Sequence, residues 1–267
     1  MIGKIISKLC FLFVFIFLYF PIAIVIVFAC NTTKSRTIFS GFTLNWFFEL
    51  FKDKIILTAF FNSLILALIT AIISTTVGTL AAMEIVKMRK KKQNLLTSLN
   101  YIPIVNSDVI TGVSLMLILK FILNILNKEF GFLTALIAHI TIAMPYVVLT
   151  IIPKLRQIEP NLIYAALDLG CSPNMVFYKV ILPNITPSII GALMLSFSIS
   201  FDDFTVSYFT TGGTFQTLPV LIYSMVRRRI TPKINALFAL VFLLALLSLI
   251  LINILNLNSN KGKQIEK

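Results

Sequence analysis

The segment Lys154–Pro187, KLRQIEPNLIYAALDLGCSPNMVFYKVILPNITP, is a polar interruption in an otherwise apolar chain. Pro160 suits the first turn of a helix, because a backbone N–H at that position has no intrahelical partner. Apolar residues then recur with helical spacing as far as Gly170. Glycine is the residue that most often follows a helix in a left-handed conformation. The pattern therefore predicts an amphipathic helix that ends in a glycine turn.

A second short helix is predicted directly after this turn. Ser172 is a residue type that caps helix N-termini, and Pro173 follows it at the first helical position. Pro183 and Pro187 are then expected to break the chain. Periodicity alone leaves two interpretations open. The element either rests on the bilayer surface or inserts an apolar helix face into a groove of a partner protein.

The composition of the whole chain excludes a soluble fold. Of its 267 residues, 58% are hydrophobic and only 12% are charged, and the mean hydropathy is +0.97. A soluble domain of this length could not cover so much apolar surface with polar groups. The net charge of +13 is divided among loops between apolar segments. Anionic lipid and the positive-inside rule account for it better than nucleic acid does.

The expected fold is an all-α integral membrane protein with six transmembrane helices. A bilayer-spanning helix needs about 20 mainly apolar residues. The predicted spans are Leu9–Cys30, Ile55–Met83, about Ile102–Leu126, Phe130–Ile152, about Pro187–Thr210 and Ile234–Leu257. The first is interpreted as a retained helix, because it is longer than a typical signal-peptide core and lacks a small-residue cleavage site. The expected organisation is an N-terminal helix with an external loop (1–54), a core (55–257) and a cytoplasmic tail (258–267).

The distribution of basic residues predicts that both termini are cytoplasmic. With that orientation, the cluster 87–92 and the segment Lys154–Pro187 lie on the cytoplasmic side. Arg227, Arg228 and Arg229 would then lie outside, against the bias. They lie late in the chain and within a longer loop, so they carry less weight.

The segment YAALDLGCSPNMVFYKVILP resembles the signature loop of ABC importer permeases. That signature reads Glu-Ala-Ala, three residues, Gly, nine residues, Ile, one residue and Leu-Pro. The positions that match it, with Asp168 inside the loop, are Ala165, Ala166, Gly170, Val180, Leu182 and Pro183. Val180 replaces the isoleucine conservatively, whereas Tyr164 stands where the family usually has glutamate.

The resemblance implies the type I ABC importer permease fold, with the signature loop between helices four and five. In that family the loop forms a coupling helix seated in a cleft of a separate ATPase subunit. The sequence contains no G-x-x-x-x-G-K-[ST] phosphate loop. We therefore expect no cofactor on this chain and no enzymatic activity, with ATP and Mg²⁺ bound by a partner ATPase dimer.

Three further stretches are similar to the spermidine/putrescine permeases of this family. They are IPIVNSDVITGVSLM (102–116), AHITIAMPYVVLTI (138–151) and LSFSISFDDFTVSYFTTG (195–212). The resemblance implies a polyamine cargo. It also implies three partners besides membrane lipids: a second homologous permease, the ATPase dimer, and an extracellular or lipid-anchored polyamine-binding protein.

Three carboxylates are candidates for the substrate pathway, namely Asp108, Asp202 and Asp203. Ionisable groups within spans are costly and usually face a cavity or a partner. Asp202 and Asp203 are adjacent, so a helix cannot point both in one direction. At most one is expected to line the pathway, while the other pairs or caps. The alternative is that these carboxylates satisfy helix ends, or pair with Lys120 or with the partner permease.

Other functions remain as alternatives. A permease for ferric iron, sulfate or a phosphonate has the same fold, although an anion site would call for basic residues in the spans. A membrane-embedded enzyme needs a catalytic constellation. The single histidine, His139, lies in an apolar span, and we expect it to be structural. A simple channel would leave the signature loop unexplained. For the triple arginine, we expect contact with an acidic face of a binding protein or with lipid head groups.

Overall fold

The computed structural model describes residues 2–33, 38–228, 231–243 and 246. The regular secondary structure of this described part is helical, with one isolated bridge between Asn31 and Phe42. Its helices are α1 (Ile2–Ala29), α2 (Asn45–Lys52), α3 (Lys54–Lys87), α4 (Lys90–Val105), α5 (Asp108–Leu126), α6 (Phe132–Arg156), α7 (Pro160–Asp168), α8 (Pro173–Val176), the π-helical turn η1 (Phe177–Ile181), α9 (Leu182–Phe201), α10 (Thr205–Thr210) and α11 (Leu218–Arg228). A further apolar helix covers Pro232–Leu243.

Within the described residues, five helical segments are long and apolar enough to cross a membrane. They are Ile6–Ala29, Lys54–Lys87, Asp108–Leu126, Phe132–Arg156 and Pro173–Phe201. The expectation of an all-helical membrane protein is therefore confirmed. The predicted sixth span, Ile234–Leu257, begins within the helix Pro232–Leu243, and most of its remainder lies outside the described residues.

The predicted third span is wrong at its beginning. Residues 102–105 belong to the end of α4 instead, and the chain leaves helical geometry at Asn106 and Ser107. α5 then starts at Asp108, whose carboxylate lies in its first turn. A negative charge there is favourable because the helix dipole is positive at that end.

The predicted fifth span is wrong at its end. We expected one helix to about Thr210, but α9 stops at Phe201 and α10 begins at Thr205. Asp202 and Asp203 occupy the break between the two helices. The break is stabilised because the Asp203 carboxylate accepts hydrogen bonds from the N–H groups of the first turn of α10.

The expected break at Pro183 and Pro187 is also wrong. Both prolines lie inside α9, and α8, η1 and α9 follow one another without an interruption. Pro183 cannot donate a backbone hydrogen bond, and the turn before it widens to π geometry, in which the N–H of Leu182 reaches the carbonyl of Phe177. The side chain of Asn184 donates to the carbonyl of Val180 at 2.7 Å. These substitutes satisfy the backbone groups at this point and let the helix continue.

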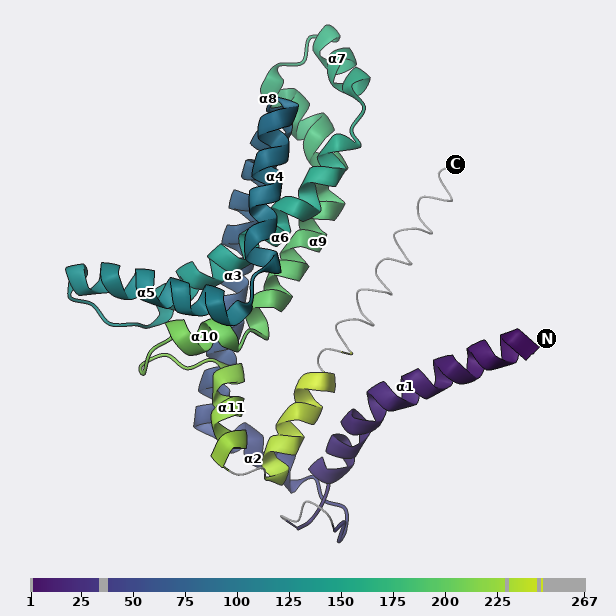
Figure 1. The fold of residues 1–267 in the computed structure, drawn as a ribbon, viewed down its shortest axis with the longest axis vertical. Helices are drawn as coiled ribbons and strands as arrows, with labels where there is room; N and C mark the ends of the chain where they lie inside the picture. Colours follow the sequence, from purple (N-terminus) through teal and green to yellow (C-terminus); the bar gives the residue numbers. More distant parts are fainter. Residues whose placement is uncertain (1, 34–37, 229–230, 244–245, 247–267) are drawn as a thin grey trace. The chain divides into compact units, whose positions relative to one another are not determined.

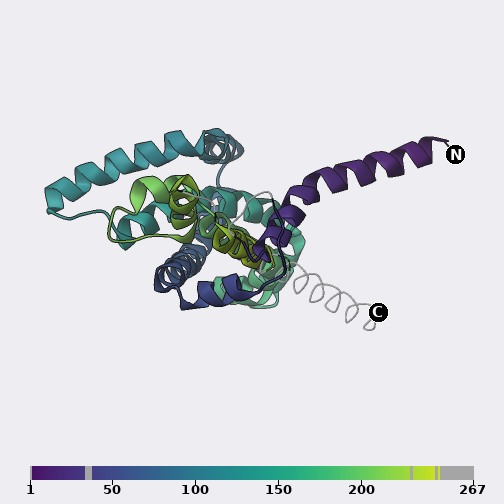
Figure 2. The ribbon, with the colours of Figure 1, turned by 90° about the horizontal axis from the view of Figure 1, so that it is seen from below.

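The chain forms two compact units, and the larger is Thr58–Leu221. Its core joins α3, α6 and α9, which run side by side in Figure 1. The buried residues of this core are Ala82, Ile85, Val147, Val148, Ile151, Ile152 and Ala192. In the same unit, α5 lies beside α10 in both views (Figures 1 and 2), and Leu119, Ala138 and Val206 form a second core cluster between α5, α6 and α10.

Buried hydroxyl groups add polar contacts between the long helices. The hydroxyls of Ser74 on α3 and Ser196 on α9 are 2.5 Å apart and buried. Hydrogen bonds of this kind hold transmembrane helices together where lipid supplies no hydrophobic drive for association.

The smaller unit comprises residues 1–57 and 222–267. In its described part, the Trp46 indole donates to the carbonyl of Asn31 at 2.7 Å, and the buried Asn31 amide in turn donates to the carbonyl of Ile38. Asp53, just before α3, forms an ion pair with Lys233. The first two contacts join Asn31, just after α1, to Ile38 and to the start of α2.

Candidate functional site

The signature loop forms the predicted helix, glycine turn and second helix. α7 begins at Pro160 and is followed by Gly170 with φ +82°. The N–H of Cys171 donates to the carbonyl of Ala166 at 3.0 Å, and the N–H of Gly170 donates to the carbonyl of Leu167 at 2.9 Å. This pair of bonds is the Schellman arrangement, in which the left-handed residue lets two terminal carbonyls find donors.

The second helix of the loop starts as the sequence indicates. The Ser172 hydroxyl accepts from the N–H of Met175 at 3.4 Å, and Pro173 occupies the first turn. α7 packs against α8 and η1, so the two arms of the loop form one folded element. Figure 1 places α7 and α8 at the same end of α4, α6 and α9.

Large apolar side chains are exposed on this folded element, beside the polar residues Asn161, Asp168, Asn174 and Lys179. Its exposed large apolar side chains are Leu162, Tyr164, Leu167, Leu169, Met175 and Tyr178. Leu169 is 85% exposed, which is unusual for a leucine in a folded loop. Among the signature residues, Ala165, Asp168, Gly170 and Pro183 are exposed, whereas Ala166, Val180 and Leu182 are half-buried. Val180 lies in η1 and Leu182 and Pro183 in α9, so these three form the start of the following span.

A cavity of about 390 Å³ brings the three predicted carboxylates together. Asp108 reaches it from the start of α5, and Asp202 and Asp203 reach it from the break between α9 and α10. Tyr146 of α6 and Phe204 contribute aromatic walls. All of these residues belong to the larger unit.

The two adjacent aspartates differ in their surroundings. Asp202 is exposed, as is Asp108. The side chain of Asp203 is only 11% exposed. Its Oδ1 accepts from the N–H of Val206 at 3.3 Å, and its Oδ2 accepts from the N–H of Ser207 at 2.7 Å. Asp203 therefore caps α10, while Asp202 and Asp108 remain accessible from the cavity.

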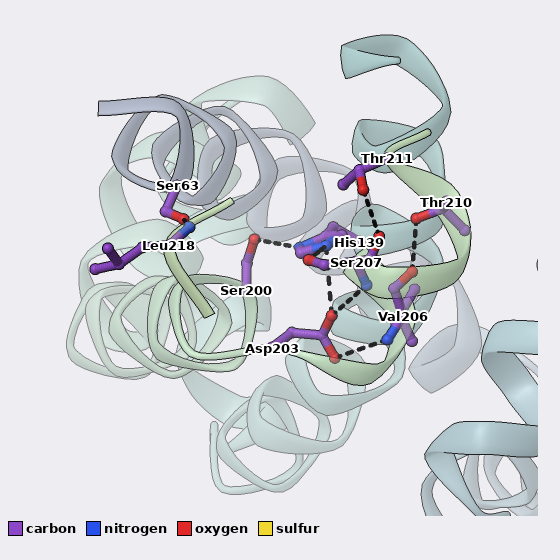
Figure 3. A network of polar contacts seen from close by, with 9 residues as sticks. All are labelled: Ser63, His139, Ser200, Asp203, Val206, Ser207, Thr210, Thr211 and Leu218. Atoms are coloured by element: carbon purple, nitrogen blue, oxygen red, sulfur yellow. Dashed lines mark hydrogen bonds and ion pairs between the residues drawn. The ribbon is translucent and has the colours of Figure 1, made fainter. Parts of the chain in front are cut away.

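A buried polar network lies behind Asp203 (Figure 3). His139 of α6 is completely buried, and its ring lies between two serines. Its Nδ1 is 2.7 Å from the hydroxyl of Ser200, and its Nε2 is 3.0 Å from the hydroxyl of Ser207. The same Nε2 lies 3.6 Å from Oδ2 of Asp203. The expectation that His139 is structural agrees with its burial, but its partners were not predicted.

The sequence interpretation missed Tyr146 in the cavity wall and the two serines around His139. Tyr146 follows Pro145 in an apolar span and has no spacing that distinguishes it from core residues. Ser200 and Ser207 are seven residues apart, which two helical turns would place on one face. This spacing could have indicated that the two serines lie together. They belong to different helices, however, so their proximity does not arise from the turns of one continuous helix.

These features define a multi-pass membrane protein of the ABC importer permease class. The chain belongs to the family described as the binding-protein-dependent transport system inner membrane component, whose pattern matches residues 74–262. It is thus an inner-membrane transport subunit rather than an enzyme, and the family implies a partner ATPase, which binds the ATP, and a binding protein.

The chain is also similar to two permeases of Escherichia coli K12. The chain is 32% identical over 262 residues, 98% of each chain, to the spermidine/putrescine transport system permease protein PotC of Escherichia coli K12. It is 35% identical over 224 residues to the putrescine transport system permease protein PotI of the same strain, covering 83% of this chain and 80% of PotI.

A solved structure shares the fold. It is a bacterial ABC transporter involved in the import of the acidic polysaccharide alginate, with a TM-score of 0.65 and 17% identity. The similarity covers 91% of this chain and 93% of that one.

Proposed function

We propose that this chain forms part of the transmembrane pathway for polyamines, with spermidine and putrescine as the cargo class. The observation that carries the proposal is the cavity at which Asp108, Asp202 and Asp203 meet. Polyamines are flexible polycations, and a path for them has to replace lost hydration with carboxylates or aromatic faces. Tyr146 and Phe204 supply such faces beside the carboxylates.

The composition of the cavity favours a cation over an anion. Among the described residues, its lining contains three carboxylates and no lysine or arginine. A sulfate or phosphonate would meet uncompensated like charge there, at a cost that grows as water is excluded. The names of the relatives PotC and PotI support the same cargo class.

The signature loop is proposed as the coupling element. α7, α8 and the turn between them expose large apolar side chains, as a surface that docks into a groove of an ATPase would. Ala165, Ala166, Asp168 and Gly170 belong to the docking arm, and Val180, Leu182 and Pro183 connect it rigidly to the next span. Closure of the ATPase pair would then move α9 and the carboxylates at its end.

We propose further that the chain completes six spans with both termini cytoplasmic. A second, homologous permease would form the other half of the pathway, and an extracellular or lipid-anchored polyamine-binding protein would deliver the cargo. The basic cluster between α3 and α4 supports this orientation, because Arg89, Lys90, Lys91 and Lys92 are exposed at the end expected to face the cytoplasm.

The decisive experiment is uptake by the complete complex reconstituted into vesicles. Labelled spermidine and putrescine should accumulate only with ATP and the binding protein present. Unlabelled sulfate and ferric iron should not compete. Accumulation of neither polyamine by a complex that hydrolyses ATP would overturn the cargo assignment, while the family assignment would stand.

A further inference from the structure

We propose that His139 is a positioning residue for the carboxylate site. It holds the break between α9 and α10 in the geometry that presents Asp202 to the cargo. The inference rests on the proposed function for its meaning in transport. Independently of transport, the His139 imidazole fixes the break between the two helices.

The two hydroxyl partners of His139 lie in different helices. Ser200 is in the last turn of α9, and Ser207 lies within α10. The imidazole therefore contacts both helices that flank the break, and it does so from a third helix, α6. A single ring engaged at both nitrogens fixes the distance between its two partners.

The imidazole and both serines that it contacts are buried. His139 and Ser207 are 0% exposed, and Ser200 is 3% exposed. Water cannot replace either hydrogen bond there, so the loss of one leaves a polar group without a partner. Each serine hydroxyl can donate or accept, so a neutral ring is satisfied in either tautomer.

The carboxylate of Asp203 lies next to the imidazole. Its Oδ2 accepts from the N–H of Ser207 and lies 3.6 Å from Nε2 of His139. The ring thus backs the carboxylate that caps α10. Asp203 is held from two sides at the break, and its neighbour Asp202 lines the same cavity with it. His139 does not line this cavity, so its effect on cargo acts through the break.

A second hydrogen bond, from a side chain of α6 to the backbone of α10, also holds these two helices together. The Thr134 hydroxyl, one turn and a half before His139, donates to the carbonyl of Thr210 at 2.7 Å. α10 is therefore held by α6 near both of its ends. With only six residues, α10 has too few internal hydrogen bonds to keep its place without such contacts.

The test uses the complete reconstituted complex and compares uptake kinetics for labelled spermidine. In His139→Leu, we expect the KM to rise about tenfold, the cost of losing hydrogen bonds that orient a charged site. The maximal rate should change by less than about twofold, because the coupling element is untouched. His139→Gln keeps a donor and an acceptor and should recover most of the affinity. Thr211→Val is the matched control, since the buried Thr211 hydroxyl, directly after α10, donates to the backbone carbonyl of Ser207 in the preceding turn.

A purely structural role for His139 gives a different result. The amount of assembled complex and the maximal rate would then fall while the KM stays at the wild-type value, and that outcome overturns the proposal. If His139→Leu does not assemble, Ser200→Ala and Ser207→Ala decide, because each removes one of the two bonds. A raised KM in both supports the inference, and a wild-type KM in both overturns it.

A readout that does not depend on cargo separates this inference from the proposed function. Hydrogen exchange at the Val206 and Ser207 amides, which donate to Asp203, should be faster in His139→Leu than in Thr211→Val. Unchanged exchange would overturn the positioning role even if polyamine uptake is found. Faster exchange together with no polyamine uptake by the wild type would remove the cargo and keep the positioning role.

Discussion

The N–H of Cys171 donates to the carbonyl of Ala166 across the end of α7, at 3.0 Å. This bond exists because Gly170, between them, adopts φ +82°. A β-carbon in that conformation meets the neighbouring carbonyl, and a side chain costs about 1–2 kcal/mol there. The direction in which the coupling element turns thus depends on one residue without a side chain.

We expect Gly170→Val to uncouple ATP hydrolysis from transport. Apart from the two neighbouring residues of the chain, no atom lies within 4 Å of a β-carbon at this position, so the effect has to come from the local backbone and not from a clash with the rest of the fold. Uptake by reconstituted complexes should fall about 5- to 30-fold, as a cost of about 1–2 kcal/mol implies, while membrane insertion and basal ATPase activity persist. Gly191→Val is the control, because Gly191 has the same open surroundings without a positive φ. Normal coupled transport in Gly170→Val would contradict the docking role.

The local structure of this loop could be predicted because its signals are local. Pro160, Gly170 and Ser172 each favour one position at a helix end, whatever the rest of the chain does. The path through Pro183 could not be predicted in the same way. Whether a proline breaks a helix depends on substitutes such as the Asn184 side chain and the π turn before it.

The carboxylate site is only partly contained in the sequence. Asp108, Asp202 and Asp203 stand out as charges within or beside apolar spans, and a charge there indicates function. Their meeting at one cavity depends on the packing of α10 against α5, which no spacing encodes. The break after Phe201 depends on a capping contact of Asp203 that a continuous apolar pattern conceals.

Close packing of α3 against α6 should make Gly78 intolerant of a side chain. A β-carbon added to Gly78 would lie 2.7 Å from Cγ1 of Val147, which is itself completely buried. We expect Gly78→Leu to lower the stability of the solubilised protein by about 1–3 kcal/mol through overpacking. Thermal unfolding measures it. Combining Gly78→Ala with Val147→Ala should restore part of the loss relative to Gly78→Ala alone, and strictly additive effects would argue against contact at this point.

The two accessible carboxylates should act on cargo affinity more than on stability. We expect Asp202→Asn and Asp108→Asn each to raise the KM for spermidine by about tenfold, or about 1.4 kcal/mol, with little change in thermal unfolding. Asp203→Ala removes the cap of α10 and should lower thermal stability in addition. Reconstituted uptake and unfolding of the same preparations separate the two effects. Equal KM values for the wild type and Asp202→Asn would exclude Asp202 from the pathway.

The basic end of α11 is a candidate contact for the binding protein. Arg227 and Arg228 are exposed in the last turn of α11, and Arg229 lies outside the described residues. Arginines that lined the entrance would repel a polycation, so we expect them to meet an acidic face instead. Replacing all three by glutamine should weaken docking of the binding protein and reduce its dependence on salt, as measured by binding to the complex in nanodiscs. Unchanged docking would leave lipid head groups as the partner.

The Asp53–Lys233 pair should give the smaller unit a defined dependence on pH. The hydrogen bond from Lys233 holds the pKa of the Asp53 carboxyl below its ordinary value of 3.8. Hydrogen bonds from the N–H groups of Ile55 and Ile56 lower this pKa as well. A carboxyl whose pKa is lowered on folding contributes stability that is fully present above pH 3.8 and is lost as the pH falls through the lower folded pKa.

Asp53→Asn isolates this contribution, because asparagine keeps the capping acceptor for Ile55 and Ile56 but cannot form the ion pair. We expect the wild type to unfold at a higher temperature than Asp53→Asn at pH 5–8, by the equivalent of about 0.2–1 kcal/mol for a partly exposed pair. The difference should shrink below about pH 4, near the unfolded pKa of aspartate, and at high salt. Thermal unfolding of both proteins across this range measures it, and a difference that persists at the lowest pH would show that it does not come from the charge of Asp53.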